Sequence, residues 1–363
     1  MALSLMFPNR FGMLRQLYER VGSATGIVDN AADLSSLVPD LNNRTFSIDL
    51  DELKQNIDRA HKEADYAAQH KIECISADMA AYPRRLAEVC PDAPPVLYFR
   101  GNADLNNAHI LSIVGTRNST VYGLDLVEEI CEDLARRFPK MLIVSGLAYG
   151  TDINAHRAAL SAHLPTVGVL AHGLDRIYPN LHRNTAEKMC EAGGLLTEFP
   201  IGTKIEAYNF LRRNRIVAGM AEGTLVVESK SHGGALATAR MANEYSLAVM
   251  ACPGRVGDVT SEGCNNLIRT NSASLVTSAD DIIETLGWQA GSEPRVILPT
   301  LFDDDMTAEE KYIYQYVVKE AKHINTIIAE SGCAVSDVLS ILSELEFRGY
   351  VRQLPGSRWY RVK

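Results

Sequence analysis

The sequence contains no unbroken apolar run of about 18 residues, which is the length that a membrane-spanning helix needs. The apolar stretch at its start is interrupted by Pro8 and is too short for a secretory signal. Bulk positive charge is also missing, because the formal net charge is -9. We therefore expect a cytoplasmic protein without membrane association, in which any nucleic-acid site is a local basic patch.

Paired cysteines are absent as well. The seven cysteines lie far apart and are odd in number, and no C-x-x-C spacing suggests zinc or a redox dithiol. A G-x-G-x-x-G turn is also missing, which disfavours a dinucleotide. The sequence therefore predicts structural thiols, with neither a metal site nor a cofactor.

The length of 363 residues, with 46% hydrophobic and 22% charged, indicates two or three globular domains. Residues 1–75 read as a helical module of the SAM or helix-hairpin-helix type, with helices at 11–21 and 50–69. Residues 289–306 combine Gly, Ser, Pro and an acidic run, which is typical of a linker. Residues 307–363 predict a winged helix, with helices at 308–321 and 324–330, a third capped by Ser336, and a Pro-Gly hairpin at 350–361.

Between these parts, residues 76–288 alternate short apolar strands with helical segments. Continuously apolar strands are expected in a parallel sheet that helices cover on both faces. The pattern predicts a Rossmann-like, doubly wound α/β domain of about six strands, whose ligand lies at the carboxyl ends of the strands. The expected strands are residues 110–114, 141–145, 166–170, 194–197, 224–228 and 247–251, preceded by a shorter run within 94–101.

The turn after the first of these strands predicts an anion site. Gly115 and Thr116 precede Arg117, and Gly123 opens the following helix. Glycine allows close approach of the backbone, the helix start offers N–H groups, and the guanidinium adds a forked donor. A plain tight turn with a solvated arginine is the alternative.

The turn after the second strand has a similar character. Ser145, Gly146 and Gly150 surround Tyr149, whose ring can stack on a base. The segment lacks the G-x-S-x-G elbow, so Ser145 is not expected to be a nucleophile. In the helix that follows, His156 is expected to be packed and hydrogen-bonded.

Residues 212–215 form the densest basic cluster of this acidic protein. On a helix, Arg212, Arg213 and Arg215 would spread over more than half of the circumference, so at least one faces the interior. An unpaired buried charge is very costly, which predicts an internal salt bridge to Glu198 or Glu228. We expect Arg215 to be the structural one and Arg213 to bind phosphate.

Further glycine turns follow the fifth and sixth strands, at 233–234, 254 and 263. Together with the first two turns they would line one rim of the sheet, as an extended groove for a polyanion. The expected phosphate- and DNA-binding residues are Gly115, Thr116, Arg117, Ser145, Gly146, Tyr149, Gly150, Arg212, Arg213, Asn214, Lys230, Gly233, Gly234, Thr238 and Asn265.

Nine short motifs occur one after another along this domain, and together they resemble the motifs of the DprA (Smf) family. They are V-G-T-R at 114–117, S-G-L-A-x-G-x-D at 145–152, G-L-D-x-x-Y-P at 173–179, E-F-P at 198–200, F-x-x-R-N-R-I at 210–216, V-V-E at 226–228, T-A at 238–239, P-G at 253–254 and G-x-N-x-L-I at 263–268. The resemblance implies a non-catalytic protein that binds single-stranded DNA without sequence preference. It also implies a homodimer through the Rossmann-like domain and loading of RecA recombinase during natural transformation.

Two departures from the family pattern concern the same rim. The usual S-G-S is replaced by G-G-A at 233–235, which removes hydroxyl donors, and the usual Gly-Ala by Ser272-Ala273. The third helix of the winged helix carries three acids and one base, the wrong charge for a major groove. Contact with a protein is therefore favoured over contact with duplex DNA.

Two other functions stay open on the sequence. The fold resembles LOG-type nucleotide phosphoribohydrolases, but Arg240 stands where their P-G-G-x-G-T-x-x-E motif carries its glutamate. The other possible function is that of a scaffold protein, which acts through its winged helix and its N-terminal helical module.

Overall fold

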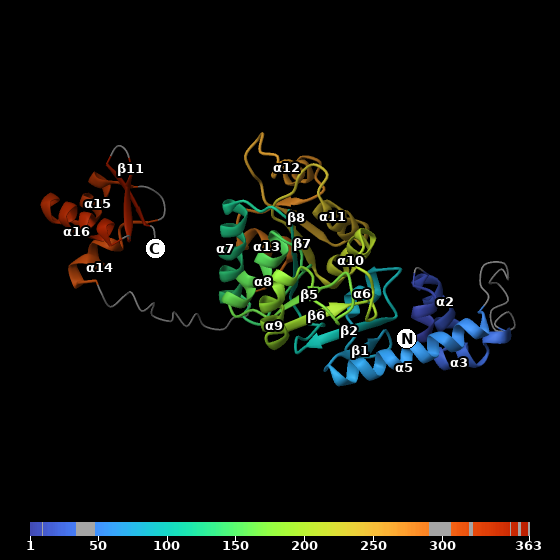
Figure 1. The fold of residues 1–363 in the computed structure, drawn as a ribbon. Coiled ribbons are helices and arrows are strands. Elements are labelled where there is room, and N and C mark those ends of the chain that lie inside the picture. Colours follow the sequence, from blue (N-terminus) through green and yellow to red (C-terminus); the bar gives the residue numbers. More distant parts are fainter. Residues whose placement is uncertain are drawn as a thin grey trace. The chain divides into compact units, whose positions relative to one another are not determined.

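The structure is a computed structural model that describes residues 1–8, 10–33, 48–289, 306–318, 322–348, 350–354 and 357–361. The chain divides into two compact units, Met1–Gly291 and Ser292–Lys363. The first unit holds the N-terminal helices and a large sheet, and the second holds the C-terminal helices and hairpin (Figure 1). Nearly all of the expected linker at 289–306 lies outside the described residues, and a division of the first unit near residue 75 stays a prediction.

The N-terminal helices include the two that the sequence predicted, with the same bounds. One ends where Gly22 adopts a left-handed φ of 83°. The other begins after Asp49, whose carboxylate accepts hydrogen bonds from the N–H groups of Asp51 and Glu52. The apolar faces of these helices share one core. The elements are α1 (Ala2–Met6), α2 (Phe11–Val21), α3 (Ala24–Asp29), the 3-10 turn η1 (Ala31–Asp33) and α5 (Leu50–Gln69).

The central sheet contains all six predicted strands, β3 to β8, and the run within 94–101 is β2. Its order is β1-β2-β6-β5-β4-β3-β7-β8-β9. Neighbours from β6 to β9 are parallel, whereas β2 is antiparallel to both β1 and β6, so the sheet is mixed. The strands are β1 (Glu73–Ser76), β2 (Val96–Gly101), β3 (Ile110–Val114), β4 (Leu142–Ser145), β5 (Thr166–Val169), β6 (Gly193–Thr197), β7 (Gly223–Val226), β8 (Ala248–Ala251) and β9 (Ser274–Leu275).

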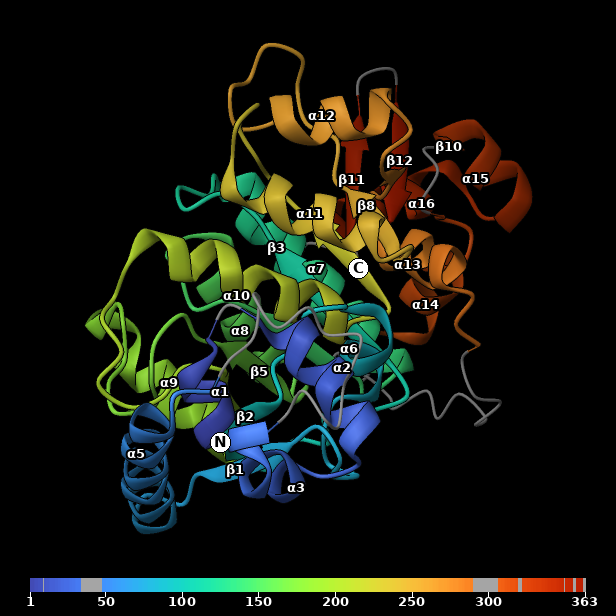
Figure 2. The same cartoon turned by 90° about the vertical axis from the view of Figure 1, so that its right-hand side faces the viewer.

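Helices cover both faces of this sheet, which explains the continuously apolar strands. In β3, Leu111 and Ile113 enter the core on one face, and Ile110 and Val114 enter the core on the other. Figures 1 and 2 show the two helical layers. The first layer is α7 (Val121–Arg137), α8 (Thr151–Ser161), α9 (Arg183–Glu191) and α13 (Ala279–Leu286), and the second is α6 (Arg84–Val89), α10 (Ala207–Met220), α11 (Gly234–Glu244) and α12 (Glu262–Arg269), with the 3-10 turn η2 (Asn180–His182) before α9.

Strand β1 corrects the expectation that residues up to 75 are helical. It pairs with β2 so that Cys74 is opposite Tyr98. The chain turns after α5 at Lys71, which has a positive φ of 55°, and Ile72 is already buried. The sheet therefore starts directly after the second long N-terminal helix.

The C-terminal unit has the expected winged-helix elements around a core that includes Leu342 and Trp359. The first helix ends at Tyr314 instead of residue 321, because the following turns make tighter i to i+3 hydrogen bonds. The N-cap of the third helix is Ala334, and the expected cap Ser336 lies inside that helix. Residues 355–356 of the hairpin turn lie outside the described part. The elements are α14 (Ala308–Tyr314), β10 (Lys322–His323), α15 (Ile324–Ser331), α16 (Val335–Phe347), β11 (Val351–Leu354) and β12 (Arg358–Arg361).

Among the described residues, no single helix has both the length and the apolar composition to cross a membrane. One pair of helices, Ile324–Ser331 with Val335–Glu346, satisfies both criteria jointly but is bent by 116°. Both of these helices contribute side chains to the core of the winged helix.

Candidate nucleic-acid interface

The loops that follow β3 and β4 interlock at the carboxyl end of the sheet. The Thr151 N–H donates to the Thr116 carbonyl at 3.0 Å. Gly150 has a φ of 73°, and a Cβ built there would lie 2.2 Å from the same Thr116 oxygen. Only glycine fits this position without displacing the backbone, so the two predicted turns form one rigid rim.

One arginine and three aromatic side chains lie on this rim; we call Arg117, Tyr149, Tyr178 and Phe210 the aromatic-basic patch. All are exposed except Phe210, which is partly buried. The Arg117 guanidinium lies 5.7 Å from the centroid of the Phe210 ring. The Phe210 and Tyr178 rings meet edge to face with centroids 6.2 Å apart. Tyr149 and Tyr178 are 47% and 44% exposed. A cation beside accessible ring faces is suited to phosphates and bases respectively.

Tyr149 is held in place from below. Its ring packs against His182 with centroids 5.1 Å apart, and His182 Nδ1 lies 3.0 Å from the Leu147 carbonyl oxygen. Burial lowers the pKa of His182, which keeps this support uncharged near neutral pH. The Tyr149 ring is therefore held in a fixed position, with its other face exposed.

A second group of expected residues lies at the start of α11. Gly233 is the N-cap and supplies no side-chain hydrogen bond, and Gly234 is exposed with open space beside it. The exposed Lys230 precedes them. Free N–H groups at a helix start beside a lysine favour an anion. Asn265 braces this area, because its amide exchanges hydrogen bonds with the backbone N–H and C=O of Gly254 at 3.2 and 3.0 Å.

The arginine cluster on α10 confirms the predicted internal salt bridge to Glu198. The Oε2 atom of Glu198 accepts from Arg212 Nη2 at 2.7 Å and from Arg215 Nη2 at 2.8 Å. Arg215 also pairs with Asp92 at 2.9 Å. Arg215 is thus structural, as expected.

The prediction that Arg212 belongs to the rim is wrong, because it is held elsewhere. Besides its bond to Glu198, its guanidinium lies 4.9 Å from the Phe11 ring centroid and 5.5 Å from that of Phe199. It therefore joins α10 to the N-terminal helices.

Arg213 also requires a correction, since we expected it to contact phosphate. It is 5% exposed and donates to the Val169 carbonyl. A Cβ at Gly146 would lie 2.6 Å from Arg213 Nη2 and 2.2 Å from Asp152 Oδ2, so the missing side chain makes room for both groups. Burial lowers the pKa of Arg213 and raises that of Asp152, whereas the attraction between them opposes both shifts. Arg213 supports the rim from inside.

Two other expected contacts are buried. The Ser145 hydroxyl donates to the Ile113 carbonyl at 2.5 Å, and Thr238 is 2% exposed. Asn214 accepts a hydrogen bond from Arg213 Nε at 3.2 Å. Ser145 and Thr238 therefore shape the rim without forming its surface, whereas Asn214 is partly exposed and is bound to Arg213.

The start of α7 is likewise not an open anion site. The carboxylate of Glu228 accepts from the Thr120 N–H at 2.8 Å and from the Thr120 hydroxyl at 2.7 Å. The Thr120 hydroxyl in turn accepts from the Gly123 N–H. The chain supplies its own anion there, and Gly115, Thr116 and Arg117 stand beside a helix end that is already capped.

His156 is packed and hydrogen-bonded, as predicted. Nε2 lies 2.5 Å from the Gly146 carbonyl, and Nδ1 lies 2.7 Å from the Thr166 hydroxyl. Burial lowers the pKa of His156 to about 4. The neutral ring, with its proton on Nε2, satisfies both neighbours.

The seven cysteines are free, and burial raises the pKa of Cys131 to about 12. Groups of three or more His, Cys, Asp or Glu side chains that could hold a metal ion are absent from the part of the chain that the structure describes. Arg240, at the position of the phosphoribohydrolase glutamate, is exposed on α11 and offers a cation there.

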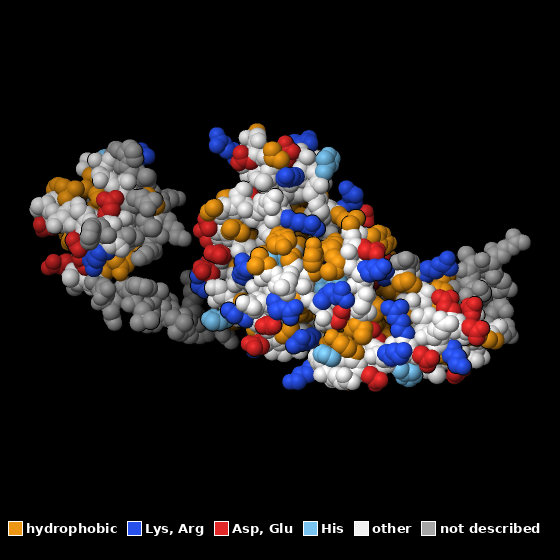
Figure 3. Space-filling view, viewed as in Figure 1, with side chains coloured by type: hydrophobic (Ala, Val, Ile, Leu, Met, Phe, Trp, Pro, Cys, Tyr) orange, Lys and Arg blue, Asp and Glu red, His pale blue; other side chains and the backbone are white. Residues whose placement is uncertain are grey.

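Sequence reasoning missed Phe210 and Tyr178 as members of the site. Both stand inside motifs that were recognised, F-x-x-R-N-R-I and G-L-D-x-x-Y-P, so an aromatic residue in each motif was the available signal. Figure 3 shows Lys and Arg side chains interspersed with hydrophobic ones across the visible face of the first unit.

Fold and site together define a Rossmann-like α/β protein with N-terminal helices, a rigid strand-end rim and a separate winged helix. Residues 73–287 match the family described as DNA recombination-mediator protein A, and residues 303–357 match the DprA winged helix domain. The chain belongs to the DprA family, whose members are recombination mediators.

Individual relatives agree. Protein Smf of Synechocystis sp. is 33% identical over 326 residues, covering 81% of each chain. The structure of DNA processing protein A (DprA) from Streptococcus pneumoniae is similar with a TM-score of 0.61 at 28% identity, covering 75% of this chain and 97% of that one. DNA processing protein A from Helicobacter pylori, described with a unique single-stranded DNA binding mode, gives a TM-score of 0.53 at 26% identity over 59% and 95% of the two chains.

Proposed function

We propose that this chain binds single-stranded DNA without sequence preference at the strand-end rim of its α/β domain. The observation that carries the proposal is the aromatic-basic patch. Arg117 is exposed and lies against Phe210, which meets Tyr178 edge to face, and Tyr149 is exposed in the neighbouring loop after β4. Stacking on rings tolerates every base, because each base has a π-face, and the guanidinium binds the phosphate that all nucleotides share.

A second phosphate contact is proposed at the start of α11. The uncapped N–H groups after Gly233 and the amino group of Lys230 belong to the segment that follows β7. This segment is the neighbour of the loop after β3 on the rim, because β7 lies beside β3 in the sheet. Asn265 acts indirectly by fixing the Gly254 turn. A strand that crosses both places makes several phosphate contacts.

The proposal is tested by measuring the affinity for a fluorescent oligonucleotide over a salt series. Replacement of Arg117 by Ala removes one phosphate contact, so the slope of log affinity against log salt falls by about 0.7. Replacement of Phe210 by Ala weakens binding by about 1–3 kcal/mol at every salt concentration, since stacking is not ionic.

Matched controls come from the same unit. Arg136, at the far end of α7, has a side chain that is 68% exposed, and Tyr18 on α2 is 36% exposed. Their replacement by Ala leaves affinity and slope unchanged. Equal losses for control and patch variants would place the site elsewhere.

We further propose that two copies associate through the β9 edge of the sheet. Ser274 and Leu275 are both exposed, and β9 pairs on one side with β8 at the end of the strand order. Leu275 is 49% exposed. An exposed edge with an apolar side chain is suited to pairing with a second chain.

Loading of RecA recombinase onto DNA during natural transformation, in the cytoplasm, is the biological role that we propose. Its support is the description of the family as recombination mediators. The expected result is that this protein shortens the lag before RecA hydrolyses ATP on DNA covered by a single-strand-binding protein. The Arg117→Glu variant does not shorten the lag, because it cannot hold the strand.

For the winged helix we propose contact with a protein. The exposed residues of α16 include Val335, Asp337, Leu339 and Glu344, which are apolar or acidic. Asp337 and Glu344 repel the phosphate backbone of duplex DNA, and Val335 and Leu339, one turn apart, offer it no charge. Removal of residues 307–363 is therefore expected to leave single-strand affinity unchanged.

A further inference from the structure

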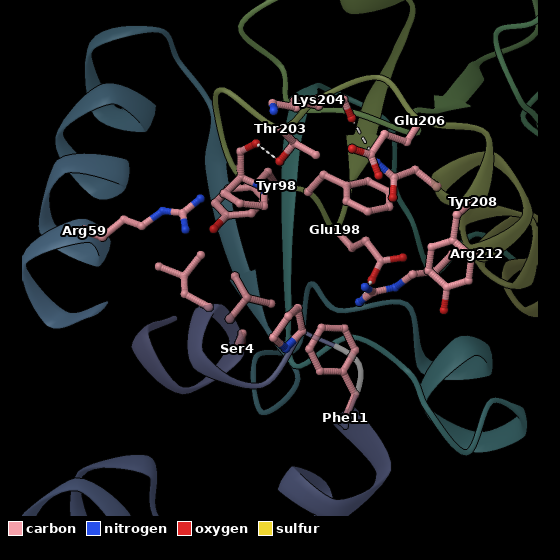
Figure 4. Close-up of a pocket in the computed structure, with 16 residues that line it drawn as sticks. Ser4, Phe11, Arg59, Tyr98, Glu198, Thr203, Lys204, Glu206, Tyr208 and Arg212 are labelled. Carbon is pink, nitrogen blue, oxygen red and sulfur yellow. Dashed lines mark hydrogen bonds and ion pairs between the residues drawn. The ribbon is translucent and has the colours of Figure 1, made fainter. Parts of the chain in front are cut away.

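A cavity of about 420 Å³ lies between the N-terminal helices and the α/β domain. Residues from α1, α2, α5, β2, the segment after β6 and the first turns of α10 line it (Figure 4). None of the four patch residues does. Its volume is in the range of small-molecule sites.

The walls of this cavity are aromatic. The rings of Phe11, Tyr98, Phe199 and Tyr208 line it, and two of them flank the Arg212 guanidinium at 4.9 and 5.5 Å. Tyr208 is 60% exposed and stands at the opening. Aromatic rings and a guanidinium plane are the surfaces on which a nucleobase stacks.

The inner wall carries a buried hydrogen-bond acceptor. Glu198 binds both Arg212 and Arg215 through Oε2, whereas its Oε1 is buried and accepts no hydrogen bond from the described residues. Buried polar atoms of native proteins nearly always have a partner. An N–H group of a ligand, such as the exocyclic amine of a base, supplies one.

Two cations also line the cavity: Figure 4 shows Arg59 across it from Glu198 and Arg212, and Lys204 at its edge beside Thr203. Arg59 belongs to α5, and Lys204 precedes α10. Both are exposed, and within the described part of the chain neither side chain has a hydrogen bond or ion pair assigned to it. Burial raises the pKa of Glu63, one turn further along α5, and the charge of Arg59 partly offsets this rise. Neither cation, however, has a carboxylate in ion-pair contact within the described part of the chain, and both are suited to a phosphate group.

We propose that this cavity binds a nucleotide, with its base stacked among the rings and directed toward Glu198 and its phosphate held by Arg59 and Lys204. The same chemistry is offered by a free mononucleotide and by the 5′-phosphorylated end of a DNA strand. The proposal is independent of the rim, because the two sites share no side chain.

The test compares dAMP with deoxyadenosine by titration calorimetry on the full chain. The wild type binds dAMP at least tenfold more tightly than deoxyadenosine, and the Arg59→Glu/Lys204→Glu variant loses that difference. Lys54 is an exposed lysine on α5, the helix of Arg59, but it does not line the cavity. The Lys54→Glu variant therefore retains the difference in affinity between dAMP and deoxyadenosine. All three exposed substitutions are expected to leave the melting temperature unchanged.

A second arm distinguishes the two sources of the nucleotide. If dAMP does not bind, but a 5′-phosphate strengthens oligonucleotide binding and the Arg59→Glu/Lys204→Glu variant abolishes that gain, the occupant is a strand end. If neither phosphate effect is seen, or if both persist in the variant, the proposal is overturned. Arg117→Glu is expected to retain whichever phosphate effect the wild type shows, so failure at the rim is recognised separately.

Discussion

Replacement of Glu198 by Gln tests whether the buried charge cluster holds the first unit together. The Glu198 side chain is 1% exposed, and its carboxylate is the shared partner of Arg212 and Arg215 at 2.7 and 2.8 Å. Arg215 would retain only Asp92, whose side chain is 57% exposed. Breaking a buried ion pair by neutralising one member costs about 3–5 kcal/mol, because the remaining charge is buried without compensation.

The measurement is urea unfolding followed by fluorescence in a Trp359→Phe background. Trp288, buried in the first unit, is then the remaining tryptophan. With a denaturant slope of about 3 kcal/mol/M, the expected midpoint falls by about 1–2 M. Glu206→Gln, at an exposed position near the same cavity, shifts the free energy of unfolding by less than about 0.5 kcal/mol. A loss below about 1 kcal/mol for Glu198→Gln would show that the buried charge cluster does not hold the first unit together.

Three further predictions concern acid stability, the rim and the dimer. Burial lowers the pKa of His156 to about 4 from the ordinary 6.5. The stability that the neutral ring contributes is therefore lost as the pH falls, by about 2 kcal/mol between pH 7 and 5. Unfolding curves of the wild type and of His156→Gln at both pH values check this, and an equal pH dependence of the two proteins would contradict it. Gly150→Ala forces a Cβ against the Thr116 carbonyl at a φ of 73°. The expected cost is about 1–3 kcal/mol, which lowers the melting temperature. An unchanged melting temperature would show that the rim adapts to the new side chain. Leu275→Glu converts dimer to monomer in light scattering without lowering the melting temperature, since the side chain is half exposed; a persistent dimer would place the interface elsewhere.

The central strands could be predicted because each is buried on both faces. Strands β3 to β8 lie between two helical layers, so nearly every residue in them is buried, most are apolar, and each run stands out from its neighbours. The two residues of β9 are too few and too exposed to give such a pattern. Strand β1 follows α5 so closely that the helical pattern obscured it.

The site was predictable in its backbone and less so in its side chains. Glycine turns at strand ends follow from local sequence, and they lie at one edge because parallel strands share a direction. The burial of Arg213 depends on Val169 and Asp152, and the rings of Tyr178 and Phe210 meet only through the tertiary fold. Helical geometry could show that some arginine faces inward, but not that all three are engaged.

The most direct test of the account compares single-stranded and double-stranded DNA of equal length in gel shifts across a salt series, for the wild type and for Arg117→Glu. We expect the wild type to prefer the single strand, because stacking on Tyr149, Tyr178 and Phe210 requires unpaired bases. Arg117→Glu should lose most of this binding, whereas Arg136→Glu, with the same change in net charge, should keep it. Wild-type affinity in Arg117→Glu, or equal affinity of the wild type for both forms of DNA, would contradict the account.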